Sequence, residues 1–129
     1  MKIEFGYGCG SQTLCVPDEN VLGVLQQNEL ALPEKTAREL VAEAIAHPIG
    51  CPPLREIVHR GEKIAIVTSD ITRPLPSYEI LPELLRALFA CGVEAADVTV
   101  VFAIGSHRRH TPEEMRQLAG DYAFETVRC

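Results

Sequence analysis

The chain has 129 residues and a net charge of −6, with 47% hydrophobic and 23% charged residues. This length suits one domain that buries a core without disulfide or metal staples. No apolar run approaches the roughly 20 residues of a membrane span, and an acidic protein lacks the clustered cations that bind nucleic acid. Because Glu4 also interrupts any signal-peptide apolar region, we expect residues 1–129 to form a single cytoplasmic domain.

The cysteines are odd in number and show neither a CxxC pair nor the Cys/His spacing of a zinc site. We therefore expect reduced thiols, several of them buried as small hydrophobes, and no structural metal. They are Cys9, Cys15, Cys51, Cys91 and Cys129.

The first predicted element is a hairpin. Residues 2–16 alternate around the glycine-rich string 6–11, which is typical of two short strands and a tight turn. The glycines resemble a phosphate-binding loop, but no helical pattern follows them, so we expect no nucleotide site there. Residues 17–28 are then predicted to form a segment that crosses from the hairpin to the next element.

A helix is predicted after Pro33, since apolar residues recur at helical spacing from Ala37 to Ile45. We expect its apolar stripe to pack on a sheet. A short helical segment around residues 54–58 follows and stops before Gly61.

Residues 63–68 form an apolar, β-branched run, as expected of a strand covered on both faces of a parallel sheet. The turn 69–77 behind it contains two prolines, which restrict its conformations. A helical stripe from Ile80 to Leu88 follows and ends at Gly92, with Pro82 tolerated near its start.

The same unit then occurs again. Residues 97–104 repeat the buried-strand pattern, and the turn 105–110 leads to a helix that runs to about Gly120. Thr111 is its predicted N-cap, and Glu114 completes a capping box.

The final residues 124–129 are predicted to be another strand. Strands that alternate with helices in this way are parallel. The fold class is therefore α/β, with a parallel-stranded, Rossmann-like three-layer sheet and an N-terminal β-hairpin. Both turns leave the carboxyl ends of their strands, so they meet at the sheet edge where such folds bind ligands.

The side chains on these two turns suit a hydroxylated anion. Arg73 offers a planar fork for a carboxylate or phosphate, and Asp70 either orients that fork or accepts a ligand hydroxyl. Thr72 adds a neutral donor and acceptor. His107 can move a proton to or from a hydroxyl, and the adjacent Arg108 favours its neutral, basic form.

Simpler interpretations stay open for each residue. An Asp-x-x-Arg pair beside prolines is often a turn held by a local ion pair, and a single histidine is often structural. We favour His107 over His110 because His107 directly follows the small pair Gly105-Ser106, which lets a ligand approach the backbone. His110 receives no functional assignment.

At these turns the sequence resembles the nickel-pincer-dependent lactate racemase family, whose members racemise or epimerise 2-hydroxy acids. The matching segments are Ser69-Asp70-Ile71-Thr72-Arg73-Pro74 and Gly105-Ser106-His107-Arg108, supported by Phe5-Gly6-Tyr7-Gly8 and Pro52-Pro53-Leu54. The resemblance covers nearly the whole chain.

The resemblance implies a two-domain α/β enzyme that holds a nickel-bearing pyridinium mononucleotide between its domains. In such an enzyme the pyridinium takes a hydride from the α-carbon of the substrate and returns it to either face. Three roles follow by resemblance for residues of this chain: cofactor contacts for Asp70, Ile71, Thr72 and Arg73, substrate binding for Arg73, Ser106 and Arg108, and hydroxyl-proton exchange for His107.

Two departures from the family limit this correspondence. Ile71 stands where some relatives have a histidine, so it offers backbone contacts or an apolar wall. Family members are several times longer, and we expect the second catalytic histidine, the cofactor-attaching lysine and the nickel-binding histidine beyond Cys129. We expect no metal ligand and no covalent cofactor attachment within this chain.

We therefore expect the N-terminal portion of a longer enzyme, either an expressed fragment or a truncated gene product, that is inactive alone. The expected partner is a 2-hydroxy acid or another small anion. One alternative is a stand-alone carboxylate- or phosphate-binding module. Another is an oligomeric scaffold, in which the last strand pairs with a second copy at its C-terminal edge.

Overall fold

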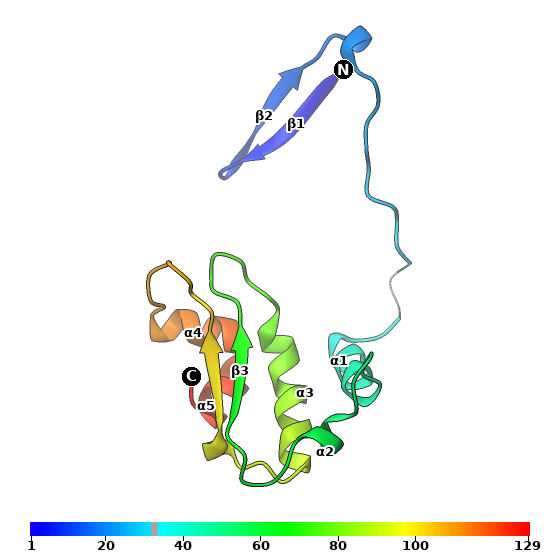
Figure 1. Cartoon of the computed structure of the whole chain (residues 1–129). Helices are drawn as coiled ribbons and strands as arrows, with labels where there is room; N and C mark the ends of the chain where they lie inside the picture. Colours follow the sequence, from blue (N-terminus) through cyan, green and yellow to red (C-terminus); the bar gives the residue numbers. More distant parts are fainter. Residues whose placement is uncertain (32–33) are drawn as a thin grey trace. The chain divides into compact units, whose positions relative to one another are not determined.

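The computed structural model describes residues 1–31 and 34–129. Pro33, from which the first predicted helix follows, lies outside the described residues. The chain divides into two compact units, Met1–Pro33 and Glu34–Cys129 (Figure 1). None of the described helices combines the length and apolar character that crossing a membrane requires.

The first unit contains the predicted hairpin. Strand β1 (Lys2–Tyr7) pairs antiparallel with β2 (Gly10–Cys15). Gly8 lies in the turn with a φ of 57°, a conformation that glycine adopts without steric cost. A short 3₁₀ turn, η1 (Asp18–Asn20), follows β2. The glycines therefore turn a hairpin instead of opening a helix.

The second unit is built on a parallel strand pair. β3 (Ile64–Thr68) pairs with β4 (Val98–Phe102), so that Ile64 lies opposite Val98. Helix α3 (Ser77–Ala90) joins the two strands, as Figure 1 shows. The predicted βαβ unit and the α/β fold class with an N-terminal hairpin are confirmed.

The core lies between this sheet and three helices. Leu81, Leu85 and Leu88 of α3 are buried together with Val98 and Val100 of β4. Each such side chain contributes roughly 1.5–3 kcal/mol on burial. Helices α4 (Pro112–Ala119) and α5 (Asp121–Thr126) complete this cluster with Ala119 and Ala123.

The prediction that both central strands are covered on both faces is wrong for the described residues. Val67 is 66% exposed and Val101 is 42% exposed, whereas Val100 is buried. Successive strand residues point to opposite faces, and α3, α4 and α5 gather on the face that carries Val98 and Val100. When the residues on both faces of a strand are apolar, the sequence does not show which face is covered.

The first helix packs differently from its prediction. α1 (Ala37–Ala46) forms at the expected place, but it lies beside α3 and not on the sheet (Figure 1). Its Arg38 pairs with Glu83 of α3 at 2.9 Å. Because α3 already covers the sheet at this point, its outer side is the surface that α1 meets. The short α2 (Leu54–Ile57) follows.

The prediction of a strand over residues 124–129 is wrong for most of that segment. Gly120, with a φ of 78°, separates α4 from α5, and the helix continues to Thr126. Ala123 and Val127 are four residues apart and both are buried in the core, which favours the helix. Strand-like pairing is limited to Arg128, whose carbonyl accepts from the Val100 N–H at 2.7 Å.

Pro82 and the cysteines also depart from expectation. Because α3 begins at Ser77, Pro82 is an interior residue and not part of the first turn. All five thiols are free, and none is buried: Cys91 and Cys129 are half-buried and the others are exposed.

Gly120 provides a test of this packing. We expect Gly120→Ala to lower the free energy of unfolding by about 1–3 kcal/mol, because its φ of 78° and ψ of 156° suit glycine alone. A Cβ there would also lie 3.0 Å from the Tyr78 Cβ. Gly61→Ala is the matched control, since Gly61 has a φ of 88° but open space around it. Urea denaturation should show a larger loss for Gly120→Ala, and equal losses would contradict the steric contribution.

Candidate active site

Two loops meet at the carboxyl ends of β3 and β4 (Figure 1). The first covers residues 69–76 and the second covers residues 103–111. Their bases are tied together, because the Ala103 N–H donates to the Thr68 carbonyl at 2.8 Å. Parallel pairing therefore brings together the two sequence segments that were predicted to form a site.

The centre of the site is a hydrogen bond between Asp70 and His107. Asp70 is only 4% exposed, and its Oδ2 pairs with Nδ1 of His107. Its other oxygen, Oδ1, accepts from the Thr72 hydroxyl at 2.9 Å and from the Thr72 N–H at 3.2 Å. Three predicted residues thus form one network between the loops.

This network determines which nitrogen of His107 is free to react. A carboxylate only accepts, so Nδ1 of His107 carries the proton that it donates to Asp70. In the neutral ring Nε2 is then an unprotonated acceptor. The His107 side chain is 50% exposed, so this second nitrogen is available to a ligand.

The charge of Asp70 supports the same role. The hydrogen bond from His107, helped by Thr72, lowers the pKa of the Asp70 carboxyl to about 2 against the opposing effect of burial. The carboxylate is therefore ionised at neutral pH. An ionised carboxylate behind an imidazole orients the ring and stabilises its protonated form, as a general base requires.

The first loop is held rigid by its own hydrogen bonds. The Arg73 N–H donates to the Asp70 carbonyl at 3.2 Å, and the Leu75 N–H donates to Oγ of Ser69 at 3.0 Å. At its base, the buried hydroxyls of Thr68 and Ser77 bond to each other. Few conformations are left for this loop to lose when a ligand binds.

Beside the pair lies a cavity of about 370 Å³, which both loops line. Its polar side chains are those of Ser69, Asp70, Arg73, Ser106 and His107. Among residues 1–31 and 34–129, no carboxylate forms an ion pair with Arg73. Asp70 bonds to His107 and Thr72, so of the two roles open to it at the sequence level, it does not orient the Arg73 fork.

Arg108 lies elsewhere. Its guanidinium donates to both carboxylate oxygens of Glu114 in α4, at 2.8 and 2.6 Å. The Thr111 N–H donates to the same carboxylate at 2.9 Å, which completes the predicted capping box. These bonds lower the pKa of Glu114 to about 2. Arg108 fixes the second loop to α4 and is not a lining residue of the cavity.

Two further residues connect the loops. The Ile71 N–H donates to Nε2 of His110 at 3.1 Å, across 39 residues of sequence. The Ile71 backbone thus bonds to the second loop, and the cofactor contact expected of Ile71 stays a prediction. His110 received no functional assignment from the sequence, and because residues 103–111 form a loop, no regular spacing there marks it as a partner of the first loop.

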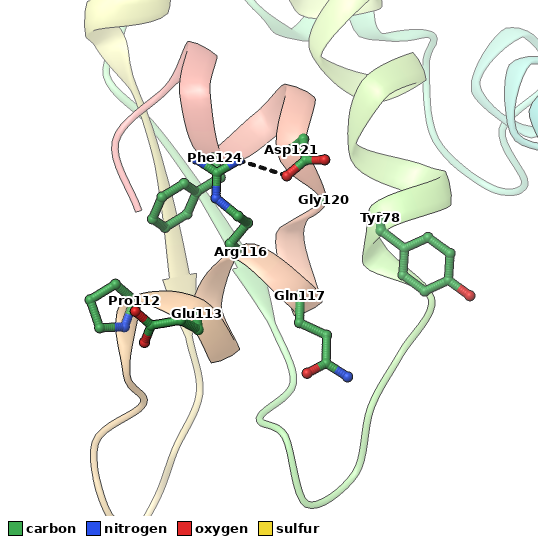
Figure 2. A pocket seen from close by; sticks show the side chains of 8 residues that line it. All are labelled: Tyr78, Pro112, Glu113, Arg116, Gln117, Gly120, Asp121 and Phe124. Carbon is green, nitrogen blue, oxygen red and sulfur yellow. Dashed lines mark hydrogen bonds and ion pairs between the residues drawn. The ribbon is translucent and has the colours of Figure 1, made fainter.

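A wider hollow of about 680 Å³ lies between the start of α3 and helices α4 and α5. Figure 2 shows Arg116 between Asp121 and Phe124 at its wall, with Tyr78 and Gln117 further out. Arg116 donates to Asp121 at 2.7 Å and to Glu125 at 2.8 Å, and it lies 4.9 Å from the Phe124 ring. Its charge is already paired, so this hollow offers less for an anionic ligand than the cavity at the sheet edge.

The donor set of the sheet-edge cavity suits an anion that carries hydroxyl groups. Arg73 supplies a charged fork, Ser69 and Ser106 supply hydroxyls, and His107 supplies an acceptor. Within the described residues, no three His, Cys, Asp or Glu side chains gather as a metal site would need. The cavity therefore fits the anionic and hydroxylated parts of a ligand.

Comparisons with known proteins agree on one family. The lactate racemase N-terminal domain matches residues 7–129. The lactate racemase of Thermoanaerobacterium thermosaccharolyticum is 33% identical over 125 residues, which cover 96% of this chain and 29% of that protein. The lactate racemase of Lactiplantibacillus plantarum is 33% identical over 122 residues, which cover 94% of this chain and 28% of that protein.

A solved structure gives the same result. The lactate racemase apoprotein from Thermoanaerobacterium thermosaccharolyticum matches with a TM-score of 0.79 and 31% identity, over 99% of this chain and 29% of that one. This chain thus spans less than a third of the length of these relatives.

The hydrogen-bonded carboxylates of Asp70 and Glu114 predict that the fold loses stability in acid. The folded pKa values of Asp70 and Glu114 are about 2, below their ordinary values of 3.8 and 4.5. The unfolded chain therefore binds these protons more readily, so their stabilisation is complete above about pH 4.5 and is lost as the pH falls through about 2. We expect Asp70→Asn and Glu114→Gln each to flatten this part of the profile of unfolding free energy against pH, and the double variant to flatten it most. Unchanged slopes would show that these bonds do not stabilise the fold.

Proposed function

Because the chain belongs to the lactate racemase N-terminal domain family, we propose that it supplies one wall of the active site of a racemase or epimerase of 2-hydroxy acids. The observation that carries this proposal is the Asp70–His107 hydrogen bond between the two loops. It presents a carboxylate-oriented imidazole to a cavity that also contains an arginine. A base beside an anion-binding group suits a substrate with a hydroxyl next to a carboxylate.

In the proposed mechanism, Arg73 binds the substrate carboxylate. Its planar fork suits bidentate pairing, and its guanidinium has no carboxylate partner within the described chain. The Ser106 hydroxyl lines the same cavity and offers a second polar contact. Binding through two groups would present the substrate hydroxyl to His107 in a defined orientation.

His107 is the proposed proton carrier. Nε2 would accept the proton of the substrate hydroxyl while Nδ1 keeps its bond to Asp70. The ionised Asp70 would stabilise the imidazolium that results, and the same nitrogen would return the proton when the product forms. General base catalysis of this kind contributes roughly 10²–10⁴-fold in rate.

The cofactor implied by the resemblance fits part of this cavity. Arg73 and Ser69 line this cavity and could hold the phosphate or ribose hydroxyls of a mononucleotide, whereas the described residues gather no ligand set for nickel. When bound, this cofactor supplies the acceptor for the hydrogen of the α-carbon. Since the chain spans 29% of its relative's length, we propose that the remaining groups come from outside it and that it does not catalyse alone.

A second candidate function is a stand-alone module that binds small carboxylates or phosphates without catalysis. The unpaired guanidinium of Arg73 within the described chain, together with the serine hydroxyls of the same cavity, supports it. The two proposals differ in one respect. A racemase wall must recognise the hydroxyl of its ligand, whereas an anion module needs only the charge.

Ligand binding tests the role of Arg73. We expect lactate to raise the melting temperature of the chain, because a ligand present at 100 times its Kd stabilises the folded state by about 2.7 kcal/mol. Arg73→Ala should abolish the shift. Arg109→Ala is the matched control, since Arg109 lies on the second loop but does not line the cavity. An undiminished shift in Arg73→Ala would contradict the proposed anion contact.

Propionate, which lacks the hydroxyl of lactate, separates the two candidates. We expect calorimetry to show tighter binding of lactate than of propionate, since a site that bonds a ligand hydroxyl disfavours the analogue without it. His107→Phe should reduce this preference, because the phenyl ring cannot accept a hydrogen bond from the lactate hydroxyl, while propionate affinity stays unchanged. Equal affinity for both ligands in the unaltered chain would favour the anion module.

A further inference from the structure

His110 connects the two loops at a second point. Its Nε2 accepts the Ile71 N–H at 3.1 Å, next to the Asp70–His107 bond. The ring is held from behind by Phe102 of β4, edge to face, with centroids 5.5 Å apart and planes at 89°. His110 precedes the Thr111 cap of α4, so its backbone is anchored as well.

Only one of the two ring nitrogens of His110 has a hydrogen-bond partner among the described residues. Since Nε2 accepts, Nδ1 carries the proton of the neutral ring. Nδ1 is buried, and no described residue bonds to it. A buried donor without a partner costs free energy, which a phenylalanine of similar shape would avoid. The stabilising contribution of this imidazole therefore lies in the bond to Ile71.

The Ile71 amide lies at a decisive place in the first loop. The Thr72 N–H bonds to the Asp70 side chain and the Arg73 N–H bonds to the Asp70 carbonyl, both within the loop. Of these three successive amides, that of Ile71 is the one that the second loop binds. A single bond between the loops limits a distance, whereas two bonds at neighbouring residues also limit rotation.

We propose that His110 is a positioning residue, which holds the Asp70 turn in the orientation that lets Asp70 accept from Nδ1 of His107. It acts through the Ile71 backbone and does not line the sheet-edge cavity. This inference deepens the proposed function, because it concerns the same histidine. Its test reports on the loops without any ligand, so the two proposals can fail separately.

The first measurement needs no substitution. In the ¹⁵N-labelled 129-residue chain, we expect the chemical shifts of His110 to show a proton on Nδ1 and none on Nε2 near neutral pH. A scalar coupling between the Ile71 amide nitrogen and Nε2 should be detectable across the hydrogen bond. A proton on Nε2, or no coupling in the folded chain, would overturn the proposal.

Two variants test the consequence for Asp70. His110→Phe keeps a ring against Phe102 but removes the acceptor, so the Ile71 amide should exchange with solvent about ten-fold faster or more. The pKa of the Asp70 carboxyl, followed by ¹³C NMR, should rise from about 2 towards its ordinary 3.8. His110→Gln places a carboxamide oxygen near the position of Nε2 and should restore both values.

The outcomes are decisive in each direction. His47→Phe is the matched control, because His47 is exposed at the end of α1 and should change neither readout. If Ile71 exchanges faster in His110→Phe while the pKa of Asp70 stays at about 2, the bond is local and the positioning role is wrong. If His110→Phe does not fold, loss of both signals in a folded His110→Gln would equally refute the role of the acceptor.

Discussion

The parallel pairing of β3 and β4 is the constraint on which the rest of the site depends. Because both strands run the same way, their loops emerge at one edge, and residues 37 positions apart in the sequence form one hydrogen bond. An antiparallel pair would place Asp70 and His107 at opposite ends of the sheet. The buried leucines of α3 hold this pairing in place, since they pack against β4 on the covered face.

The charges at this edge are divided between structure and chemistry. Glu114 is committed to Arg108 and to the cap of α4, which fixes the second loop. Asp70 is committed to His107, which orients a base. Arg73 has no such commitment to a carboxylate in the described part of the chain. A cavity with one available cation and one oriented base suits a small hydroxylated anion better than a neutral ligand.

The resemblance to lactate racemases extends from the short motifs to nearly the whole chain. The family match covers residues 7–129, and the structural match has a TM-score of 0.79 over 99% of the chain. The relatives are about three times longer, as their coverage of 28–29% shows. Within the matched segment, one face of the sheet is uncovered, and Val67 on that face is 66% exposed.

Local chemistry was sufficient to predict the hairpin, the two central strands, the capped helix at Thr111 and the two loops, because turns, caps and periodicity depend on neighbouring residues. It failed at residues 124–126, where burial of Ala123 and Val127 decided the helix. It failed also for the uncovered sheet face, since apolar strand residues do not reveal which helices reach them.

By itself, the sequence determined which residue types lie at the sheet edge and that Asp70 and His107 share it. The tertiary structure alone decided their partners: Asp70 bonds to His107 and not to Arg73, Arg108 bonds to Glu114, and His110 holds Ile71. The reason is physical. A hydrogen bond requires its two atoms to approach within about 3 Å in a favourable direction, and for distant residues that geometry depends on packing, which no sequence spacing contains.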